Sequence, residues 1–197
     1  MSGRSWDASY QDGAVAPWDI GRPQAAFVRV AAERGFAGDV LDAGCGTGEH
    51  ALLAASLGCP VLGVDVAETA ISLARKKADE RGLTAQFAVA DALELRRLGR
   101  TFETVLDCGL FHTFDRDQRP PYVASLASVT QPAGTVYVLC FSDDAPDIGP
   151  HPISRADLDE AFNEGSGWNI VTVEPDTIQT TFVESGMPAW FATIRRI

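Results

Sequence analysis

The sequence predicts an α/β protein, a three-layer sandwich in which helices cover both faces of a mostly parallel sheet. Strand-like apolar runs alternate along the chain with helix-like segments, at the spacing expected of strand–helix–strand units. The first of these runs starts at residue 40, ends at Asp42 and leads through three closely spaced glycines into a helix-like segment. With 197 residues, 46% of them hydrophobic, the chain is long enough to bury one substantial core, and its length favours a single domain.

The first half of the chain supplies three strands and the helices between them. Residues 49–57 are rich in Ala and Leu and are followed by Gly58, which predicts a helix with a glycine stop. Residues 68–81 carry apolar side chains at helical spacing and are followed by Gly82, which predicts a second helix. The predicted strands of this half are residues 40–42, 60–65 and 85–90.

The second half predicts four more strands and two more helices. The strands are residues 104–107, 134–141, 168–174 and 189–196, and the helices are residues 118–129 and 154–163. No helix signal separates the last two strands, so we expect an antiparallel hairpin with residues 177–187 as its connection. Residues 1–24 and the Pro/Asp/Gly-rich loop of residues 142–152 fit neither pattern. The chain is therefore divided into an N-terminal segment, residues 1–24, and one domain, residues 25–197.

Charge and composition exclude several kinds of partner. The chain has 16 basic and 27 acidic side chains, a formal net charge of −11 that would repel a nucleic-acid backbone. No apolar run approaches the roughly 20 residues needed to cross a bilayer, and the N-terminus lacks the apolar stretch of a signal peptide. We expect a cytoplasmic protein, a monomer or weak homodimer, whose partner is a small molecule rather than nucleic acid or a membrane.

The four cysteines do not indicate a metal or redox centre. Cys45, Cys59, Cys108 and Cys140 occur singly, without the paired Cys-x-x-Cys spacing of zinc and redox sites. We expect them to be reduced and to behave as small apolar residues, and we predict no metal site.

The glycine turn after the first strand indicates a nucleotide-binding loop. Gly44, Gly46 and Gly48 allow positive φ and a close approach of the backbone to a ligand, because glycine has no Cβ. A dinucleotide-binding loop has the spacing Gly-x-Gly-x-x-Gly, whereas here the third glycine comes one residue early and Glu49 follows it. The loop is therefore a poor match for a pyrophosphate ligand.

The first four predicted strands each end at or next to a carboxylate. Asp42, Asp65, Asp91 and Asp107 lie at carboxyl ends of strands, where open α/β sheets bind ligands, so we expect them to converge on one crevice. Asp65 follows Gly44 by 21 residues, the spacing of a carboxylate that accepts from both ribose hydroxyls, and Asp91 is suited to an adenine amino group. Such a crevice repels phosphate and suits a cationic nucleoside. S-adenosylmethionine, with a ribose, an adenine, an ammonium and a sulfonium, meets this description.

These residues carry a family resemblance. The run Val-Leu-Asp-Ala-Gly-Cys-Gly-Thr-Gly, with Asp65 and the pair Asp91–Ala92, resembles the class I S-adenosylmethionine-dependent methyltransferases over nearly the whole chain. The resemblance implies a Rossmann-like seven-stranded sheet with an antiparallel last strand, and S-adenosylhomocysteine as the product. It places residues around the methionine end, the ribose and the adenine of the donor. The donor-binding residues so predicted in the domain are Asp42, Gly44, Cys45, Gly46, Gly48, Asp65, Val66, Asp91, Ala92 and Asp107.

The N-terminal segment narrows the resemblance. Trp6, Tyr10 and Gly13, followed by Pro-Trp-Asp-Ile-Gly at residues 17–21, look like the aromatic segment that covers the cofactor in the halide, thiol and thiopurine methyltransferase group. This implies that Trp6, Tyr10 and Trp18 contact cofactor and substrate, with Tyr10 standing where a tryptophan is more usual. Aromatic faces attract a sulfonium and exclude water. We call residues 1–24 the lid segment; the alternative is that it merely caps the core.

His112 is the candidate catalytic base. It lies just past the fourth strand, where the chain enters the crevice, and the unperturbed pKa of histidine suits proton removal near neutrality. The alternative is a structural histidine packed beside Phe111 and Phe114. A thiol or halide acceptor needs little or no base.

The sequence also allows three other interpretations. Asp107 with Asp143 and Asp144 invites comparison with magnesium-dependent catechol methyltransferases, but no asparagine or second close ligand accompanies the pair. A non-catalytic S-adenosylmethionine-binding protein would keep the glycine loop and acids without needing an aromatic lid. An oxidoreductase would require the missing glycine at position 49.

The sequence therefore predicts a small-molecule methyltransferase. The N-terminal resemblance favours a thiol acceptor, and His112 as base favours a phenolic or heterocyclic hydroxyl as the alternative. Acceptor choice is expected to depend on regions without a readable pattern. These are residues 1–24, 110–114, 142–152 and 186–188.

Overall fold

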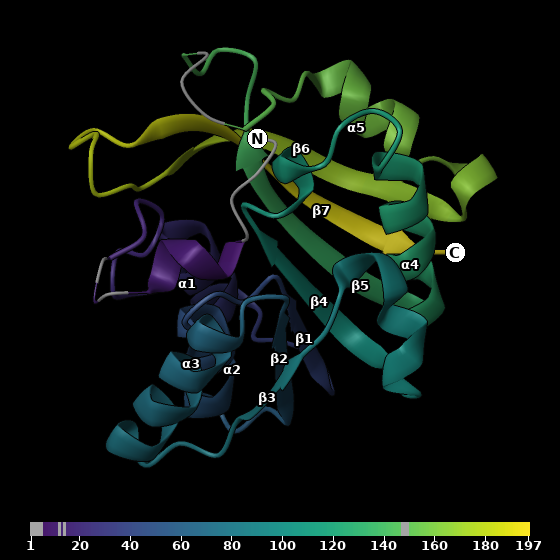
Figure 1. The fold of residues 1–197 in the computed structure, drawn as a ribbon. Coiled ribbons are helices and arrows are strands. Elements are labelled where there is room, and N and C mark those ends of the chain that lie inside the picture. Colours follow the sequence, from purple (N-terminus) through teal and green to yellow (C-terminus); the bar gives the residue numbers. More distant parts are fainter. Residues whose placement is uncertain (1–5, 12, 14, 147–149) are drawn as a thin grey trace.

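The computed structural model describes residues 6–11, 13, 15–146 and 150–197. Its centre is one seven-stranded sheet of order β3-β2-β1-β4-β5-β7-β6, with helices on both sides (Figure 1). The strands are β1 (Val40–Ala43), β2 (Val61–Asp65), β3 (Gln86–Val89), β4 (Phe102–Cys108), β5 (Thr130–Phe141), β6 (Trp168–Ile178) and β7 (Met187–Arg196). β7 is antiparallel to both of its neighbours, and the other pairs are parallel. The predicted fold class and its antiparallel last strand are confirmed.

Helices cover the two faces of the sheet with separate apolar clusters. The helices are α1 (Ala25–Glu33), α2 (Glu49–Ser56), α3 (Glu68–Arg81), α4 (Arg119–Val129) and α5 (Arg155–Ala161). Buried side chains of α1, α2 and α3 belong to one cluster, and those of α4 and α5 belong to the other. Figure 1 shows these two groups of helices on opposite sides of the strands. The result is the predicted three-layer arrangement.

Local sequence explains where several of these elements begin and end. The small residues Ala70, Ala74 and Ala78 of α3 are buried, so this helix lies close to the sheet. α3 ends at Gly82, whose φ of 62° is the left-handed conformation favoured at helix C-termini. α5 begins with a capping box in which Ser154 and Asp157 satisfy each other's backbone N–H groups.

Three parts of the fold differ from the prediction. β5 begins at Thr130 rather than at residue 134, because the chain pairs with Phe102 of β4 as soon as α4 ends. The hairpin of β6 and β7 is longer than expected, and residues 179–186 connect its strands. α1 was not predicted, and it buries Phe27 against His50 and Phe191.

Three short helical turns were also not predicted, and they frame the crevice. They are η1 (Trp6–Tyr10), η2 (Ala92–Leu98) and η3 (Phe111–Thr113). Residues 1–5, 12 and 14 of the lid segment, and residues 147–149 of the predicted loop 142–152, lie outside the described residues. None of the described helices is long and apolar enough to cross a membrane.

Candidate functional site

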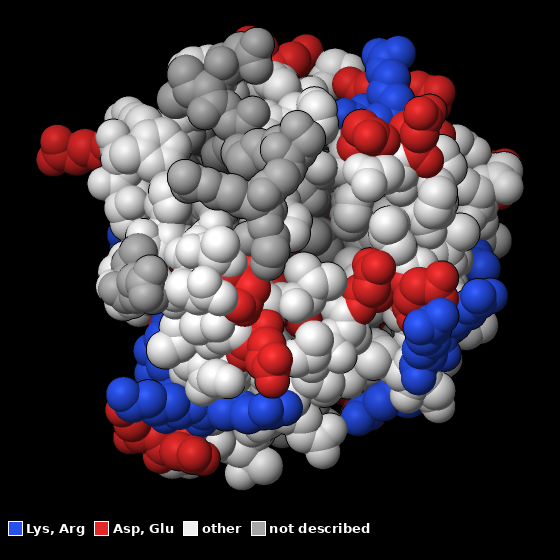
Figure 2. Space-filling view, viewed as in Figure 1, with Lys and Arg blue, Asp and Glu red and all other residues white. Residues whose placement is uncertain are grey.

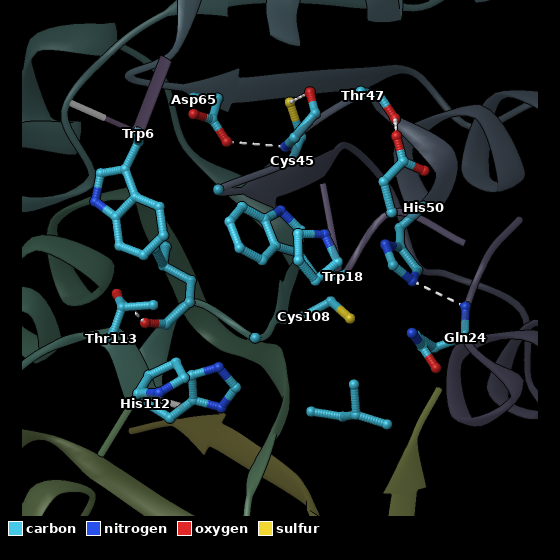
Figure 3. A pocket seen from close by; sticks show the side chains of 18 of the residues that line it. Trp6, Trp18, Gln24, Cys45, Thr47, His50, Asp65, Cys108, His112 and Thr113 are labelled. Atoms are coloured by element: carbon cyan, nitrogen blue, oxygen red, sulfur yellow. Dashed lines mark hydrogen bonds between the residues drawn. The ribbon is translucent and has the colours of Figure 1, made fainter. Parts of the chain in front are cut away.

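A cavity of about 370 Å³ lies at the carboxyl ends of β1, β2 and β4, between the lid segment and the tip of the β6–β7 hairpin. On the face of the molecule shown in Figure 2, acidic side chains approach the middle, whereas Lys and Arg side chains lie toward the edges. Figure 3 shows Asp65 and Cys45 on one side of the cavity, His112 on the other side, and Trp6 and Trp18 between them. The cavity therefore has two ends of different character.

We name the two ends by the residues that line them. The acidic end is lined by Gly44, Cys45, Gly46, Asp65, Val66, Asp91 and Ala92. The apolar end is lined by His112, Phe114, Phe141, Ile178, Phe182 and Met187.

The glycine turn brings backbone to the acidic end. Gly46 has a φ of 52°, and a Cβ there would lie 3.1 Å from the Tyr10 hydroxyl, so a side chain would disturb the lid contact. Gly48 has a different task from the one predicted. It does not line the cavity, and a Cβ there would lie within 2.9 Å of both Phe87 and Ala74. Gly48 is therefore required for close packing of α2 rather than for ligand contact.

Asp65 organises the acidic end. Its Oδ2 accepts a hydrogen bond from Gly46 N at 2.9 Å, and its Oδ1 accepts from Ala67 N at 2.9 Å. Burial raises the pKa of Asp65, while the backbone N–H groups at Ala67 and Gly46 act to lower it. Each carboxylate oxygen retains a second lone pair, so Asp65 can still accept from a ligand.

Asp91 lies at the outer rim of the same end. Its Oδ1 accepts from Leu93 N at 2.9 Å and so caps η2, and its side chain is exposed. Ala92 is buried beside it and Val66 is half-exposed, and all three line the cavity. The structure thus brings these predicted residues together.

The predicted convergence of four carboxylates is wrong for Asp42 and Asp107, which do not line the cavity. Asp42 is buried, and its Oδ2 accepts from Ala51 N in the first turn of α2, so it fixes the helix behind the glycine turn. Asp107 is buried and accepts from Leu110 N, Phe111 N and the Tyr122 hydroxyl, which shapes the turn into η3. Burial raises the pKa of Asp42 to about 7 and that of Asp107 to about 6. Both act on the cavity through the backbone that they hold.

The three lid aromatics form one contact group over the cavity. The Trp6 and Trp18 rings meet edge to face with centroids 5.7 Å apart, and the Trp18 indole donates to the Tyr10 hydroxyl at 2.8 Å. All three residues line the cavity. Trp6 and Trp18 remain 39% and 40% exposed, so their faces are available to a ligand.

Several polar contacts hold the lid segment, among them hydrogen bonds of Gln24 with His50 and Gln179, and none of them was predicted from the sequence. Asp7 accepts from Thr69 N at the start of α3 at 2.7 Å. The Thr47 hydroxyl, next to the glycine turn, donates to Asp19 at 2.6 Å, and Thr181 N donates to the carbonyl of Pro17 at 2.9 Å. Asp19 lies inside the run Pro-Trp-Asp-Ile-Gly, so the available signal was an acid directly after the lid aromatic Trp18.

His112 lines the apolar end as predicted, but its hydrogen bonding conflicts with the predicted base. Its Nδ1 accepts from the backbone N–H of Phe141 at 2.8 Å, and its ring stacks on the Phe141 ring with centroids 4.3 Å apart. Burial lowers the pKa of His112 to about 3. The ring is therefore neutral with its proton on Nε2, and it has no free lone pair toward the cavity.

Other reactive candidates are inactive in this setting. Cys45 and Cys108 line the cavity, but burial raises the pKa of both thiols, which keeps them protonated. His50 accepts from Gln24 N, and burial lowers its pKa to about 4. Among the described residues no group of three or more His, Cys, Asp or Glu side chains is arranged to hold a metal ion.

Sequence comparisons find methyltransferases among the proteins similar to this chain. Residues 40–134 match the family model described as a methyltransferase domain. A 2-heptyl-1-hydroxyquinolin-4(1H)-one methyltransferase of Mycobacteroides abscessus is 38% identical over 173 residues, which cover 86% of this chain and 75% of that protein. The protein named Probable thiol methyltransferase 2 in Arabidopsis thaliana is 26% identical over 76% of this chain and 66% of its own length.

A solved structure from work on the conversion of a disulfide bond into a thioacetal group during echinomycin biosynthesis has a similar fold. It superposes with a TM-score of 0.85 and 38% sequence identity, over 96% of this chain and 91% of that one.

Proposed function

The chain belongs to the class I S-adenosylmethionine-dependent methyltransferases, and we propose that it methylates an ionisable hydroxyl group on a small aromatic heterocycle. Family membership makes S-adenosylmethionine the methyl donor. The small molecule in the name of the Mycobacteroides abscessus relative supports a small-molecule acceptor. The observation that carries the finer proposal is the apolar end, where a single buried imidazole lies among aromatic and aliphatic side chains. A flat apolar acceptor with one reactive oxygen matches this wall.

We assign donor binding to the acidic end. Asp65 accepts from the ribose hydroxyls, Asp91 and Ala92 bind the adenine, and the turn from Gly44 to Thr47 faces the methionine end. The absence of a lysine or arginine among the acidic-end residues agrees with a donor that carries a sulfonium and no phosphate. When bound, this donor supplies a methyl carbon that is already activated toward displacement.

The lid aromatics are assigned to orientation and exclusion of water. Trp18 contacts Trp6 by ring packing and Tyr10 by a hydrogen bond, so the three side chains act as one cover. Aromatic faces over the reacting centre attract the sulfonium and keep solvent from it. Alignment of donor and acceptor then supplies most of the catalysis, since methyl transfer needs no covalent intermediate with the protein.

The name of the Mycobacteroides abscessus relative supports an oxygen acceptor, because that protein acts on a hydroxyquinolinone. A sulfur acceptor is the second candidate. It is supported by the thiol methyltransferase name at 26% identity and by the sulfur chemistry of the echinomycin structure at 38% identity. Both acceptor types react as anions, so one cavity can suit both.

A panel of acceptors tests the proposal. Release of S-adenosylhomocysteine is measured with 2-heptyl-1-hydroxyquinolin-4(1H)-one, simple phenols, thiophenol and iodide. We expect the hydroxyquinolinone to give the highest kcat/KM. Faster turnover of thiophenol would replace the proposal by the sulfur candidate.

Two controls separate catalysis from binding. Asp65→Asn should abolish turnover of every acceptor by weakening donor binding. A protein that is stabilised by S-adenosylmethionine in a thermal shift, yet methylates nothing in the panel, would be a binding protein rather than the proposed enzyme.

A further inference from the structure

We infer that His112 donates a hydrogen bond to the methyl acceptor instead of removing its proton, so the site selects acceptors that react as preformed anions. This inference rests on the proposed function, since it describes the acceptor of that reaction.

The imidazole of His112 is fixed on two sides. Its Nδ1 accepts from Phe141 N at 2.8 Å, and its ring lies 4.3 Å from the Phe141 ring at an interplanar angle of 19°. The side chain is only 4% exposed, yet it lines the cavity. A backbone N–H and a parallel aromatic ring together leave the imidazole one orientation.

That orientation determines the tautomer. A nitrogen that accepts an N–H must carry its lone pair in the ring plane, so the single proton of the neutral ring lies on Nε2. Desolvation by burial, together with a smaller effect of His151 from the loop after β5, lowers the pKa of His112 to about 3. The ring therefore stays neutral at the pH of the assay. Because Nδ1 is engaged by Phe141 N, the Nε2–H group is the hydrogen-bond donor that His112 can still use toward a ligand.

The charges around the cavity explain why an anionic acceptor needs this donor. Asp65 and Asp91 line the cavity, as do Asp19 and Glu49, of which Glu49 pairs with Lys77 and Arg81 outside the wall and Asp19 lies 3.8 Å from Lys77. Among the described wall residues Arg22, which is exposed, is the only lysine or arginine. An anion that enters this field needs a hydrogen-bond donor close to its charge. The neighbouring Thr113 hydroxyl donates to the carbonyl of Leu110 at 2.7 Å, so it is already engaged.

The reaction balances without a protein base. The acceptor X–H loses its proton to solvent, and His112 Nε2–H stabilises the resulting X⁻ in the cleft. X⁻ forms the new bond to the methyl carbon as the carbon–sulfur bond breaks, and the electron pair of that bond stays on sulfur. An anion and a sulfonium thus give X–CH₃ and the neutral thioether of S-adenosylhomocysteine. Acceptors with weakly acidic hydroxyls are excluded, because nothing at the apolar end takes their proton.

Two substitutions at one position separate a donor from a base. His112→Gln keeps an N–H near the Nε2 position, whereas His112→Asn keeps an acceptor near Phe141 N and withdraws the donor from the cavity. Neither amide can act as a base. We expect kcat/KM for the preferred acceptor to fall about 10- to 100-fold in His112→Asn and less than about fivefold in His112→Gln.

A binding measurement makes the same distinction without turnover. The absorbance of 4-nitrophenol or of the hydroxyquinolinone is titrated against pH with protein saturated by S-adenosylhomocysteine. The wild type should lower the pKa of the bound acceptor, and His112→Gln should retain this shift while His112→Asn loses it. His50→Gln is the matched control, because His50 is a partly buried histidine that lines the cavity outside the apolar end and also accepts from a backbone N–H, so its loss should leave the shift unchanged.

The outcomes distinguish this inference from the proposed function. Equal losses of kcat/KM in His112→Gln and His112→Asn, or a shift that survives His112→Asn, would overturn the donor role while the protein remains a methyltransferase. A protein that binds S-adenosylhomocysteine but methylates no member of the panel would overturn the proposed function itself.

Discussion

The two ends of the cavity are built in different ways. The acidic end is made by consecutive short segments at the ends of β1, β2 and β3, and its residues follow one another within a span of about fifty positions. The apolar end joins η3, the end of β5 and the β6–β7 hairpin, which lie far apart along the chain. The first end is therefore encoded locally and the second is encoded by tertiary packing.

This difference also fits the two ligands, since the methyl donor is shared by many enzymes and the acceptor is not. Glycine conformations and strand-end carboxylates fix the acidic end through backbone hydrogen bonds such as Gly46 N to Asp65. The apolar end depends on the shapes of side chains from separate elements, one of which, Phe182 on the connection between β6 and β7, is 54% exposed. A donor common to many enzymes suits the first construction, and an acceptor particular to one enzyme suits the second.

The largest expected effect is at the acidic end. Asp65→Asn replaces one oxygen by an amide that cannot accept from a ribose hydroxyl or from a backbone N–H. We expect affinity for S-adenosylhomocysteine to fall about 100-fold, measured by isothermal titration calorimetry. Asp91→Asn is the matched control, and because Asp91 is exposed we expect a loss of about fivefold or less. Equal losses in the two variants would contradict a ribose contact at Asp65.

The next effect links the two ends. Trp18→Ala removes the ring contact with Trp6 and the hydrogen bond to Tyr10, so the lid should lose its shape over the reacting atoms. We expect KM for the acceptor to rise about tenfold, with a smaller change in donor affinity. Val15→Ala is the control, since Val15 lies in the same segment, is 69% exposed and does not line the cavity. A similar change in both variants would mean that the lid only caps the core.

The sequence predicted the acidic end better than the apolar end for the same physical reason. The antiparallel β7 and the residues on the cavity wall follow from local patterns and from the motifs that carry the family resemblance. These wall residues are Gly44, Cys45, Gly46, Asp65, Val66, Asp91 and Ala92. The prediction that Asp42 and Asp107 line the cavity was wrong. Sequence periodicity shows that a residue lies at the end of a strand, but not whether its side chain points toward a helix or toward the cavity. Both acids turned out to bind backbone N–H groups behind the wall.

At the apolar end the sequence predicted that His112 lies in the crevice, but not its tautomer or its hydrogen-bond partner. The sequence pointed to His112 because this residue follows β4. Its tautomer, however, depends on the backbone N–H of Phe141, which lies 29 positions later and reaches the imidazole only in the folded protein. No local signal relates the two. Likewise, the attachment of Pro17 to Thr181 joins segments 164 positions apart, so the lid could be predicted but not its anchors.

The stability of the fold should depend on pH in opposite ways through Asp107, behind the cavity wall, and through the histidines that line the cavity. Folding raises the pKa of Asp107 to about 6, so the folded state keeps a proton that the unfolded state releases, and stability falls as pH rises from about 4 toward 6. Folding lowers the pKa of His50 to about 4 and of His112 to about 3, so stability rises with pH over much of the same range. The two trends oppose each other.

Asp107→Asn should expose the histidine trend. We expect the variant's unfolding free energy to rise more steeply with pH between about 4.5 and 6 than the wild type's, by up to about 1.4 kcal/mol per pH unit. Urea denaturation at a series of pH values measures this slope. His50→Gln is the opposing control and should make stability fall more steeply over the same range. Parallel curves for wild type and Asp107→Asn would mean that Asp107 is ionised in the folded protein throughout.

The smallest effect concerns the attachment of the lid to the glycine turn. Thr47 donates to Asp19 and accepts from Lys77, whose Nζ also pairs with Glu49 at 2.8 Å. Thr47→Val keeps the shape of the side chain and removes both hydrogen bonds, whereas Thr47→Ser keeps them. Because Asp7 and Pro17 still anchor the segment, we expect only about a threefold loss of S-adenosylhomocysteine affinity, with faster proteolytic cleavage within residues 6–24. If Thr47→Val left both measurements at the values of Thr47→Ser, the lid would be held over the acidic end by its aromatic contacts rather than by this hydroxyl.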